Sequence, residues 1–276
     1  MSRFFRLVQS LWVPAFAGMT VACTQPIPPN GIVSNNPCID SILAEIAAPG
    51  QIAAISHYSH GAESGSAPLD WARAIPAIGD TAEEIIAARP RLVLTGNLAS
   101  SGTNAALAKA GIKMVTMGVP ATLAENDAQI RMIAKAIGRA AAGERLIGSI
   151  SPGTGVADSI AGGKPGTAPT ALIWQTGGFV AGAGTLQDEL LARAGYINAA
   201  SLYGLKQWDI LPLETLLRAP PDVIFMPHSG GGDDGRALER RYSVLRHVRN
   251  IRIVEFPDKL LFCGGPTVAK VMAVLR

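Results

Sequence analysis

Three side chains near residue 58 are of types that bind transition metals. His57 and His60 flank Tyr58 in one short run. Imidazole nitrogens are common metal ligands, and a tyrosine oxygen can ligate the iron of haem. A histidine pair in a loop without a nearby carboxylate is more often a polar rim, however, and Tyr58 is equally suited to be the aromatic wall of a cleft. We therefore expect no metal site unless the ligand is haem, in which case Tyr58 and His57 are the candidate iron ligands.

The chain has three cysteines, and none has the spacing of a metal site. Cys38 and Cys263 are far apart in the sequence. They can form a disulfide only if the fold brings their Cα atoms close together. Two separate buried thiols are an equal alternative. The sequence leaves this pairing open.

Catalytic motifs are incomplete. Gly182-Ala183-Gly184 precedes a predicted helix and is similar to the start of a dinucleotide-binding fingerprint, but Gln187 occupies the place of the third glycine. The chain contains no Gly-x-Ser-x-Gly sequence. We therefore expect no catalytic residues and no enzymatic activity. An α/β enzyme with a cofactor near Gly182 is the distant alternative.

The first 22 residues have the pattern of an export signal. Arg3 and Arg6 precede a mostly apolar stretch at residues 7–22, an order that is typical of secretory signal peptides. The stretch is too short, and too often interrupted by Pro and Gly, for a membrane span. We therefore predict a signal peptide at residues 1–22 and export of the mature protein.

Small residues precede Cys23 in the order Thr-Val-Ala-Cys. This order resembles the lipobox of bacterial lipoproteins, although Leu is usual at the place of Thr20. Acylation of Cys23 would tether the protein to the membrane through lipid alone. Ordinary cleavage near Ala22 would leave it without an anchor. Both outcomes stay open, and we expect no other membrane contact.

The composition is that of a well-packed globular protein. Of the 276 residues, 48% are hydrophobic and 16% are charged, so the chain can bury a full core as one large domain or as two lobes. This balance excludes a disordered chain and a coiled coil. The net charge of +3 comes from scattered Lys and Arg without a basic stripe, so we expect no nucleic-acid partner.

Strand patterns alternate with helical patterns in the first and last thirds of the chain, which predicts mostly parallel sheets. The middle has helical spacing over residues 123–137 and 140–160, and Pro152 is expected to kink or break the second helix. We therefore predict an α/β fold with two lobes, a helical linker and a ligand cleft between the lobes. The predicted bounds are 24–139 for the N-terminal lobe, 140–162 for the linking helix and 163–276 for the C-terminal lobe.

Ordered motifs along the chain are similar to those of one family. IVSNNPC at residues 32–38 resembles the family's opening strand and turn. TAEEIIAARPRLVL at residues 81–94 resembles its helix-then-strand block, and LETLL at residues 213–217 begins the same block again. From Ile32 to its end, the chain thus resembles the periplasmic substrate-binding proteins of ABC importers for cobalamin, haem and ferric siderophores. In these proteins a long helix joins two α/β lobes.

The resemblance implies a function in import. The protein would capture a small-molecule metal chelate, without a resident cofactor, and deliver it to the permease of an ABC importer and its ATPase. In this family one glutamate on each lobe docks arginines of the permease, and by the matched blocks these glutamates fall on Glu83 and Glu214. Exposed carboxylates near helix starts are ionised and can pair with Arg in bidentate fashion.

The resemblance also indicates where the ligand binds. Trp208 falls where cobalamin-binding members have a ligand-stacking Trp, Tyr58 falls in their aromatic first-lobe loop, and Phe179 opens the second-lobe segment that faces the ligand. Aromatic walls suit a planar, largely apolar macrocycle. We therefore expect cobalamin as the ligand, with haem or a ferric siderophore as alternatives. The expected ligand-binding residues are Asn36, Tyr58, Trp174, Phe179, Trp208 and Phe262.

Overall fold

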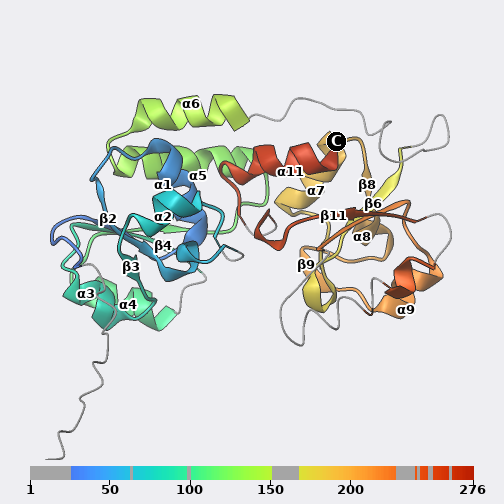
Figure 1. Ribbon diagram of the computed structural model, residues 1–276, viewed down its shortest axis with the longest axis horizontal. Coiled ribbons are helices and arrows are strands. Elements are labelled where there is room, and N and C mark those ends of the chain that lie inside the picture. The colour runs from blue at the N-terminus through green and yellow to red at the C-terminus, as the bar shows by residue number, and fades with distance from the viewer. Residues whose placement is uncertain are drawn as a thin grey trace, which may run out of the picture.

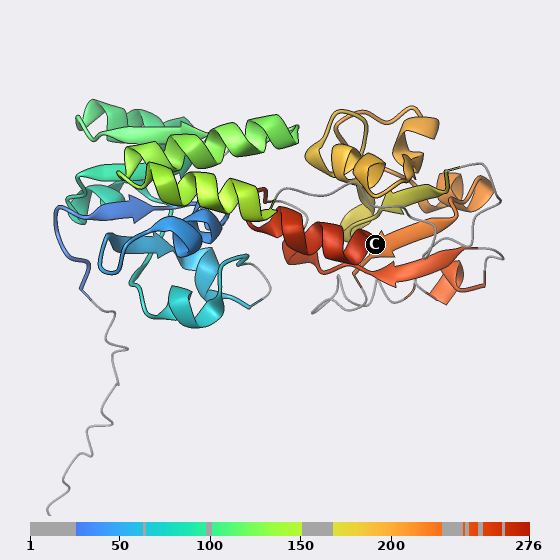
Figure 2. The same cartoon turned by 90° about the horizontal axis from the view of Figure 1, so that it is seen from above.

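The computed structural model describes residues 26–62, 65–97, 101–150, 168–227, 240, 243–247, 251–260 and 263–276. The predicted signal peptide, Cys23, Pro152 and Phe262 lie outside these residues. The described chain forms two lobes, each built on its own β-sheet (Figure 1; Figure 2). The predicted α/β class with parallel sheets is confirmed.

The first lobe has a five-stranded parallel sheet with the strand order β3-β2-β1-β4-β5. Its strands are β1 (Ile32–Ser34), β2 (Ile52–Ser56), β3 (Ala77–Ile78), β4 (Leu92–Gly96) and β5 (Met114–Met117). The helical elements are α1 (Pro37–Ile46), η1 (His57–His60), α2 (Leu69–Arg73), α3 (Ala82–Ala87), α4 (Ser101–Lys109), α5 (Leu123–Ala136) and α6 (Ala140–Ile150).

Helices cover both faces of this sheet, which is why its strands are apolar at nearly every position. Successive strand residues face opposite sides. Ile32 packs with residues of α1, α5 and α6, whereas its neighbour Val33 packs with residues of α3 and α4. Figure 1 shows these two helical layers above and below the sheet.

Side-chain caps fix where several of these helices begin. The Oδ1 atom of Asn36 accepts hydrogen bonds from the backbone N–H groups of Cys38 (2.9 Å) and Ile39 (3.2 Å). Thr81 and Thr122 cap α3 and α5 in the same manner. Such caps satisfy N–H groups that the first helical turn leaves unpaired. Asn36 therefore sets the start of α1 at the carboxyl end of β1.

The second lobe has a four-stranded parallel sheet with the order β11-β10-β6-β8, beside a two-stranded antiparallel ribbon, β7-β9. The strands are β6 (Thr170–Ile173), β7 (Phe179–Ala181), β8 (Ile197–Asn198), β9 (Trp208–Ile210), β10 (Val223–Met226) and β11 (Arg252–Glu255). The helical elements are η3 (Thr176–Gly178), α7 (Leu186–Arg193), α8 (Ala199–Leu202), α9 (Leu213–Arg218), η4 (Asp258–Leu260) and α11 (Thr267–Leu275).

The same alternation builds the core of the second lobe. Val223 and Phe225 pack with residues of α7 and α11, whereas Ile224 and Met226 pack with residues of α8 and α9. Each side chain in these runs is fully buried. The sheet is therefore covered on both faces, as in the first lobe.

Helices α5 and α6 pack on the first lobe and also approach the second. Ile133 of α5 and Leu146 of α6 belong to the core of the first lobe, whereas Leu123, the first residue of α5, belongs to the core of the second. The described part of the predicted linking helix, Ala140–Ile150, thus packs on the first lobe as a partner of α5.

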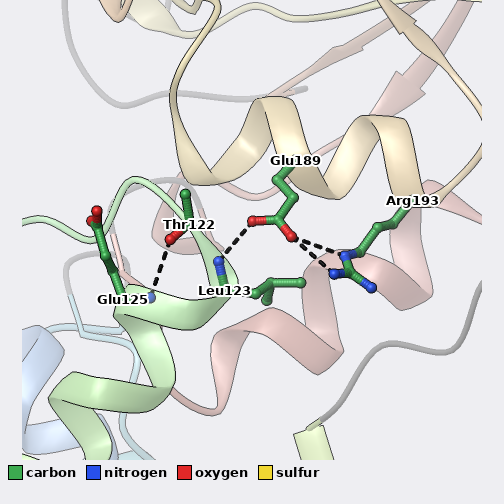
Figure 3. Close-up of polar contacts among 5 residues, drawn as sticks. All are labelled: Thr122, Leu123, Glu125, Glu189 and Arg193. Carbon is green, nitrogen blue, oxygen red and sulfur yellow. Dashed lines mark hydrogen bonds and ion pairs between the residues drawn. The ribbon is translucent and has the colours of Figure 1, made fainter.

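Several contacts join the lobes. Cys38 and Cys263 form a disulfide, with 5.0 Å between their Cα atoms. Glu189 of α7 accepts a hydrogen bond at Oε2 from the backbone N–H of Leu123 (2.8 Å), while its Oε1 pairs with Arg193 (Figure 3). The hydroxyl of Ser66 donates to the carbonyl of Lys259 (2.8 Å). The relative position of the lobes is therefore fixed at separate points.

Removal of the disulfide should destabilise the folded chain. The bond links residues 225 positions apart, so it restricts the unfolded chain strongly. The double variant Cys38→Ser/Cys263→Ser should lose about 2 to 5 kcal/mol of unfolding free energy. Denaturant unfolding under oxidising conditions measures this loss. An unchanged midpoint and slope would contradict the prediction.

Candidate functional site

A cavity of about 420 Å³ lies between the two lobes. Residues of both lobes line it, and most of its surface is apolar. Its described lining consists of Asn36, Cys38, Ile39, Ile42, Gly96, Asn97, Met117, Gly118, Val119, Pro120, Gln129, Phe179, Trp208, Gly264 and Gly265.

The first lobe contributes the carboxyl ends of three neighbouring strands. Asn36 follows β1, Asn97 follows β4, and the segment 117–120 ends β5 and leads into α5. Loops at the carboxyl ends of parallel strands meet at one edge of the sheet, where ligands bind in open α/β folds. The strand order thus brings segments that are distant in the sequence to one wall.

The second lobe contributes two aromatic side chains from the β7-β9 ribbon. Phe179 begins β7 and Trp208 begins β9, and the antiparallel register pairs Trp208 with Ala181. The Phe179 side chain is 45% exposed. An exposed aromatic face at a cavity gives a planar ligand a surface for stacking.

The backbone near Gly182 explains the position of this ribbon. The N–H of Gly182 donates to the carbonyl of Gln207 (2.5 Å), and a Cβ atom on Gly182 would lie 2.7 Å from that oxygen and 2.9 Å from the carbonyl oxygen of Leu205. Only glycine allows this close approach. Gly182 was considered above as part of a dinucleotide-binding loop. In the structure it packs instead against the backbone of Leu205 and Gln207, in the segment that leads into Trp208.

Tyr58 and His57 lie outside the cavity lining in the described structure. Both belong to η1, which follows the carboxyl end of β2, and their rings lie 4.0 Å apart between centroids. The Tyr58 side chain is 47% exposed. Within the described residues, no three His, Cys, Asp or Glu side chains are grouped to hold a metal ion.

The turn that carries Tyr58 is held by a buried acid of α1, Asp40. Its Oδ2 accepts hydrogen bonds from the hydroxyl of Ser59 (2.6 Å) and the backbone N–H of Ser56 (3.0 Å). Burial raises the pKa of Asp40 from 3.8 to about 7, and hydrogen bonds from Ser34, Ser59 and Ser56 oppose this rise. Asp40 thus connects the helix that begins at the cavity with the Tyr58 turn. Sequence reasoning missed it.

Trp174 corrects one sequence prediction. It was expected in the ligand site, but its side chain is 1% exposed and packs in the core of the second lobe with Leu172, Leu216 and Ile224. Trp174 directly follows β6, and the alternation of side chains along that strand places its side chain on the sheet face that α8 and α9 cover. Among the described residues, the aromatic side chains that line the cavity are those of Phe179 and Trp208.

Glu83 and Glu214 have corresponding positions in the two lobes. Each is an exposed residue in the first turn of a short helix, α3 and α9 respectively. Figure 1 shows α3 and α9 along the lower edge of the molecule, one in each lobe. Neither glutamate lines the cavity.

The sequence pattern of one family, described as periplasmic binding protein, matches residues 32–260. The chain belongs to the periplasmic binding protein family. It is accordingly a substrate-binding protein of an ABC importer, and the expected resemblance is confirmed. No curated protein shows a significant sequence match. None of the helices in the described residues is long and apolar enough to cross a bilayer.

Solved structures share the fold of this periplasmic binding protein. The periplasmic heme-binding protein RhuT from Roseiflexus sp. RS-1, in apo form, is 24% identical, with a TM-score of 0.67 over 90% of this chain and 98% of its own. A periplasmic heme-binding protein from Pseudomonas aeruginosa is 20% identical, with a TM-score of 0.69 over 90% and 91%. HutB of Vibrio cholerae, also a periplasmic heme-binding protein, is 17% identical, with a TM-score of 0.64 over 88% and 96%.

Replacing Asp40 should remove a pH dependence of stability. Because the pKa of Asp40 is raised on folding, the folded chain keeps a proton that the unfolded chain loses between about pH 4 and pH 7. The stability from this proton is fully present below about pH 4, and it falls by about 1.4 kcal/mol per pH unit toward pH 7. Denaturant unfolding of the wild type and of Asp40→Asn across this range tests it, and parallel pH profiles would contradict it.

Proposed function

We propose that the protein captures haem in the cavity between its lobes and delivers it to the permease of an ABC importer. The observation that carries this proposal is the chemistry of the described part of the cavity wall, which consists of apolar side chains, the aromatic rings of Phe179 and Trp208, and a few amides. A porphyrin is flat and apolar over most of its surface, so it matches such a wall. Solved structures with the same fold are named as heme-binding proteins.

The cavity supports haem over the other chelates considered. No Lys, Arg or His side chain is among its described lining residues. A ferric siderophore with anionic groups around its iron would favour cationic partners, whereas the broad faces of haem are apolar and its two carboxylates lie together at one edge of the ring. Cobalamin, the ligand expected first from the sequence, is bulkier than haem because it carries a nucleotide arm and amide side chains around its ring. A cavity of about 420 Å³ suits the more compact macrocycle better.

Cobalamin remains the second candidate because of Trp208. This residue was expected to stack on a corrin ring, and it is part of the cavity wall. Titrating the purified protein with haem, cobalamin and a ferric siderophore, by calorimetry and visible spectroscopy, distinguishes the candidates. We expect haem to bind with a shifted Soret band. Tighter binding of cobalamin than of haem would overturn the haem proposal.

Truncating the aromatic wall should weaken haem binding. Trp208→Ala should lower the affinity by about 1 to 3 kcal/mol, or about 5- to 150-fold, because a buried stacking surface is lost. Tyr203→Phe, a change outside the cavity lining, serves as a control and should bind normally. Calorimetry measures both affinities. Equal affinities for Trp208→Ala and the wild type would remove Trp208 from the ligand site.

We also propose Tyr58 as the candidate ligand of the haem iron. Its phenol oxygen is of the right chemical type, and its turn follows β2 at the same sheet edge that forms the cavity wall. Tyr58→Phe keeps the ring and removes the oxygen, so it should shift the spectrum of the haem complex and lower haem affinity while cobalamin binding stays the same. A spectrum identical to that of the wild-type complex would exclude Tyr58 as the ligand.

The proposed docking to the permease involves Glu83 and Glu214. The double variant Glu83→Ala/Glu214→Ala should abolish uptake in cells, because charge pairs that are desolvated at an interface are costly to break from one side. Haem affinity of the purified variant should stay unchanged, since neither glutamate lines the cavity. The pair Glu84→Ala/Asp209→Ala, also exposed acids of the two lobes, is the matched control. Normal uptake by the Glu83/Glu214 variant would contradict the assignment.

A further inference from the structure

The segment Cys263–Gly265 comes late in the chain but is fixed on the first lobe. Cys263 is joined by the disulfide to Cys38 of α1. The backbone N–H of Gly265 donates to the Oδ1 atom of Asn126 in α5 (2.5 Å), and the Asn126 side chain is almost fully buried. Two different helices of the first lobe thus hold this segment, one by a covalent bond and one by a buried hydrogen bond.

Close packing leaves the segment little freedom. A Cβ atom on Gly264 would overlap the Oδ1 atom of Asn126, and one on Gly265 would lie 2.6 Å from Cγ1 of Ile42. Gly265 also has a φ of +64°, in the left-handed region that favours glycine. The hydroxyl of Thr267 donates to the carbonyl of Cys263 (2.7 Å), which ties the segment to the start of α11.

Part of this arrangement lines the cavity, although Asn126 and Cys263 themselves are not among its described lining residues. Cys38 and Ile42 contribute to the cavity wall from α1, and Gly264 and Gly265 contribute to it directly. The other described contacts between the lobes differ in this respect. Neither the bond between Glu189 and Leu123 nor the bond between Ser66 and Lys259 involves a residue of the cavity lining.

We propose that Asn126 and the Cys38–Cys263 disulfide are positioning groups that hold Gly264 and Gly265 as a fixed wall of the ligand cavity. The inference rests on the proposed function, because it assumes that the ligand occupies this cavity. A wall fixed before binding does not have to be ordered by the ligand, so the ligand is held more tightly. A loosened wall should act mainly on the dissociation rate.

The proposal predicts that ligand binding depends on the contacts of Cys263–Gly265 more than on other contacts between the lobes. If Asn126 and the disulfide only kept the lobes together, breaking any contact between the lobes would weaken ligand binding to a similar degree. If these groups fix the cavity wall, only variants at Asn126 or at the disulfide should weaken ligand binding. Glu189 provides the comparison, because its bond to Leu123 also joins the lobes, at the first residue of the helix that contains Asn126.

The experiment compares Asn126→Leu, which removes the acceptor while keeping a side chain of similar size, with Glu189→Ala and with Leu190→Ala. Leu190 is buried in the core of the second lobe, so this last variant is a control for lost stability alone. Stopped-flow mixing with haem gives the dissociation rate. Hydrogen exchange of the ligand-free protein reports the protection of the Gly265 amide independently of any ligand.

We expect Asn126→Leu to speed amide exchange at Gly265 and to raise the haem dissociation rate at least about tenfold. The disulfide variant Cys38→Ser/Cys263→Ser should behave likewise, whereas Glu189→Ala and Leu190→Ala should change the dissociation rate less than about twofold. Faster exchange in Asn126→Leu with an unchanged dissociation rate would overturn the inference, as would equal rate increases in all variants. Failure of the wild type to bind haem would instead overturn the proposed function, while the exchange result would still test the fixed wall.

Discussion

The covalent link between Cys38 and Cys263 is the constraint on which the ligand cavity depends. Each lobe has its own sheet and core. Correct folding of each lobe therefore does not by itself set the distance between the two lobes. The disulfide closes a loop of 225 residues and brings the segment before α11 onto α1. Asn126 holds the same segment from α5, where two glycines allow backbone and helix to approach closely. A wall of the cavity is thereby built from residues near the two ends of the described chain.

The composition of the cavity wall, in turn, indicates how the proposed ligand is held. Its described lining contains amides and apolar groups, and no ionisable side chain is among them. Burying an isolated charge would be costly, so a neutral wall suits a ligand whose broad faces are apolar. Beside the proposed iron ligand Tyr58, the proposed recognition relies on shape and stacking, so the placement of Phe179 and Trp208 on the β7-β9 ribbon is important for it. That placement depends on the close backbone contact between Gly182 and Gln207.

Local sequence patterns were sufficient for most of the fold and insufficient for much of the site. The run at residues 92–94 and the helix at residues 267–275 have strong local signals, and the structure contains both. Trp174 was misplaced because a strand that is apolar throughout does not reveal which face a given residue occupies. The short strands β7 and β9 were missed because a contact distant in sequence creates them. Asp40 was missed because an acid in the first turn of a helix ordinarily lies in solvent, where it favours the helix dipole.

The distribution of charge separates ligand capture from recognition by the importer. The proposed docking residues, Glu83 and Glu214, are exposed at the first turns of corresponding helices, and neither is part of the cavity wall. Exposed carboxylates attract arginines over a distance, whereas the described lining of the cavity carries no charged side chain that would add to this attraction or oppose it. In this proposal the importer recognises the protein by the spacing of two charges, and that spacing depends on the contacts that hold the lobes together. The two proposed tasks thus depend on different contacts: the disulfide and Asn126 fix the cavity wall, whereas all the contacts between the lobes together set the distance between the two carboxylates.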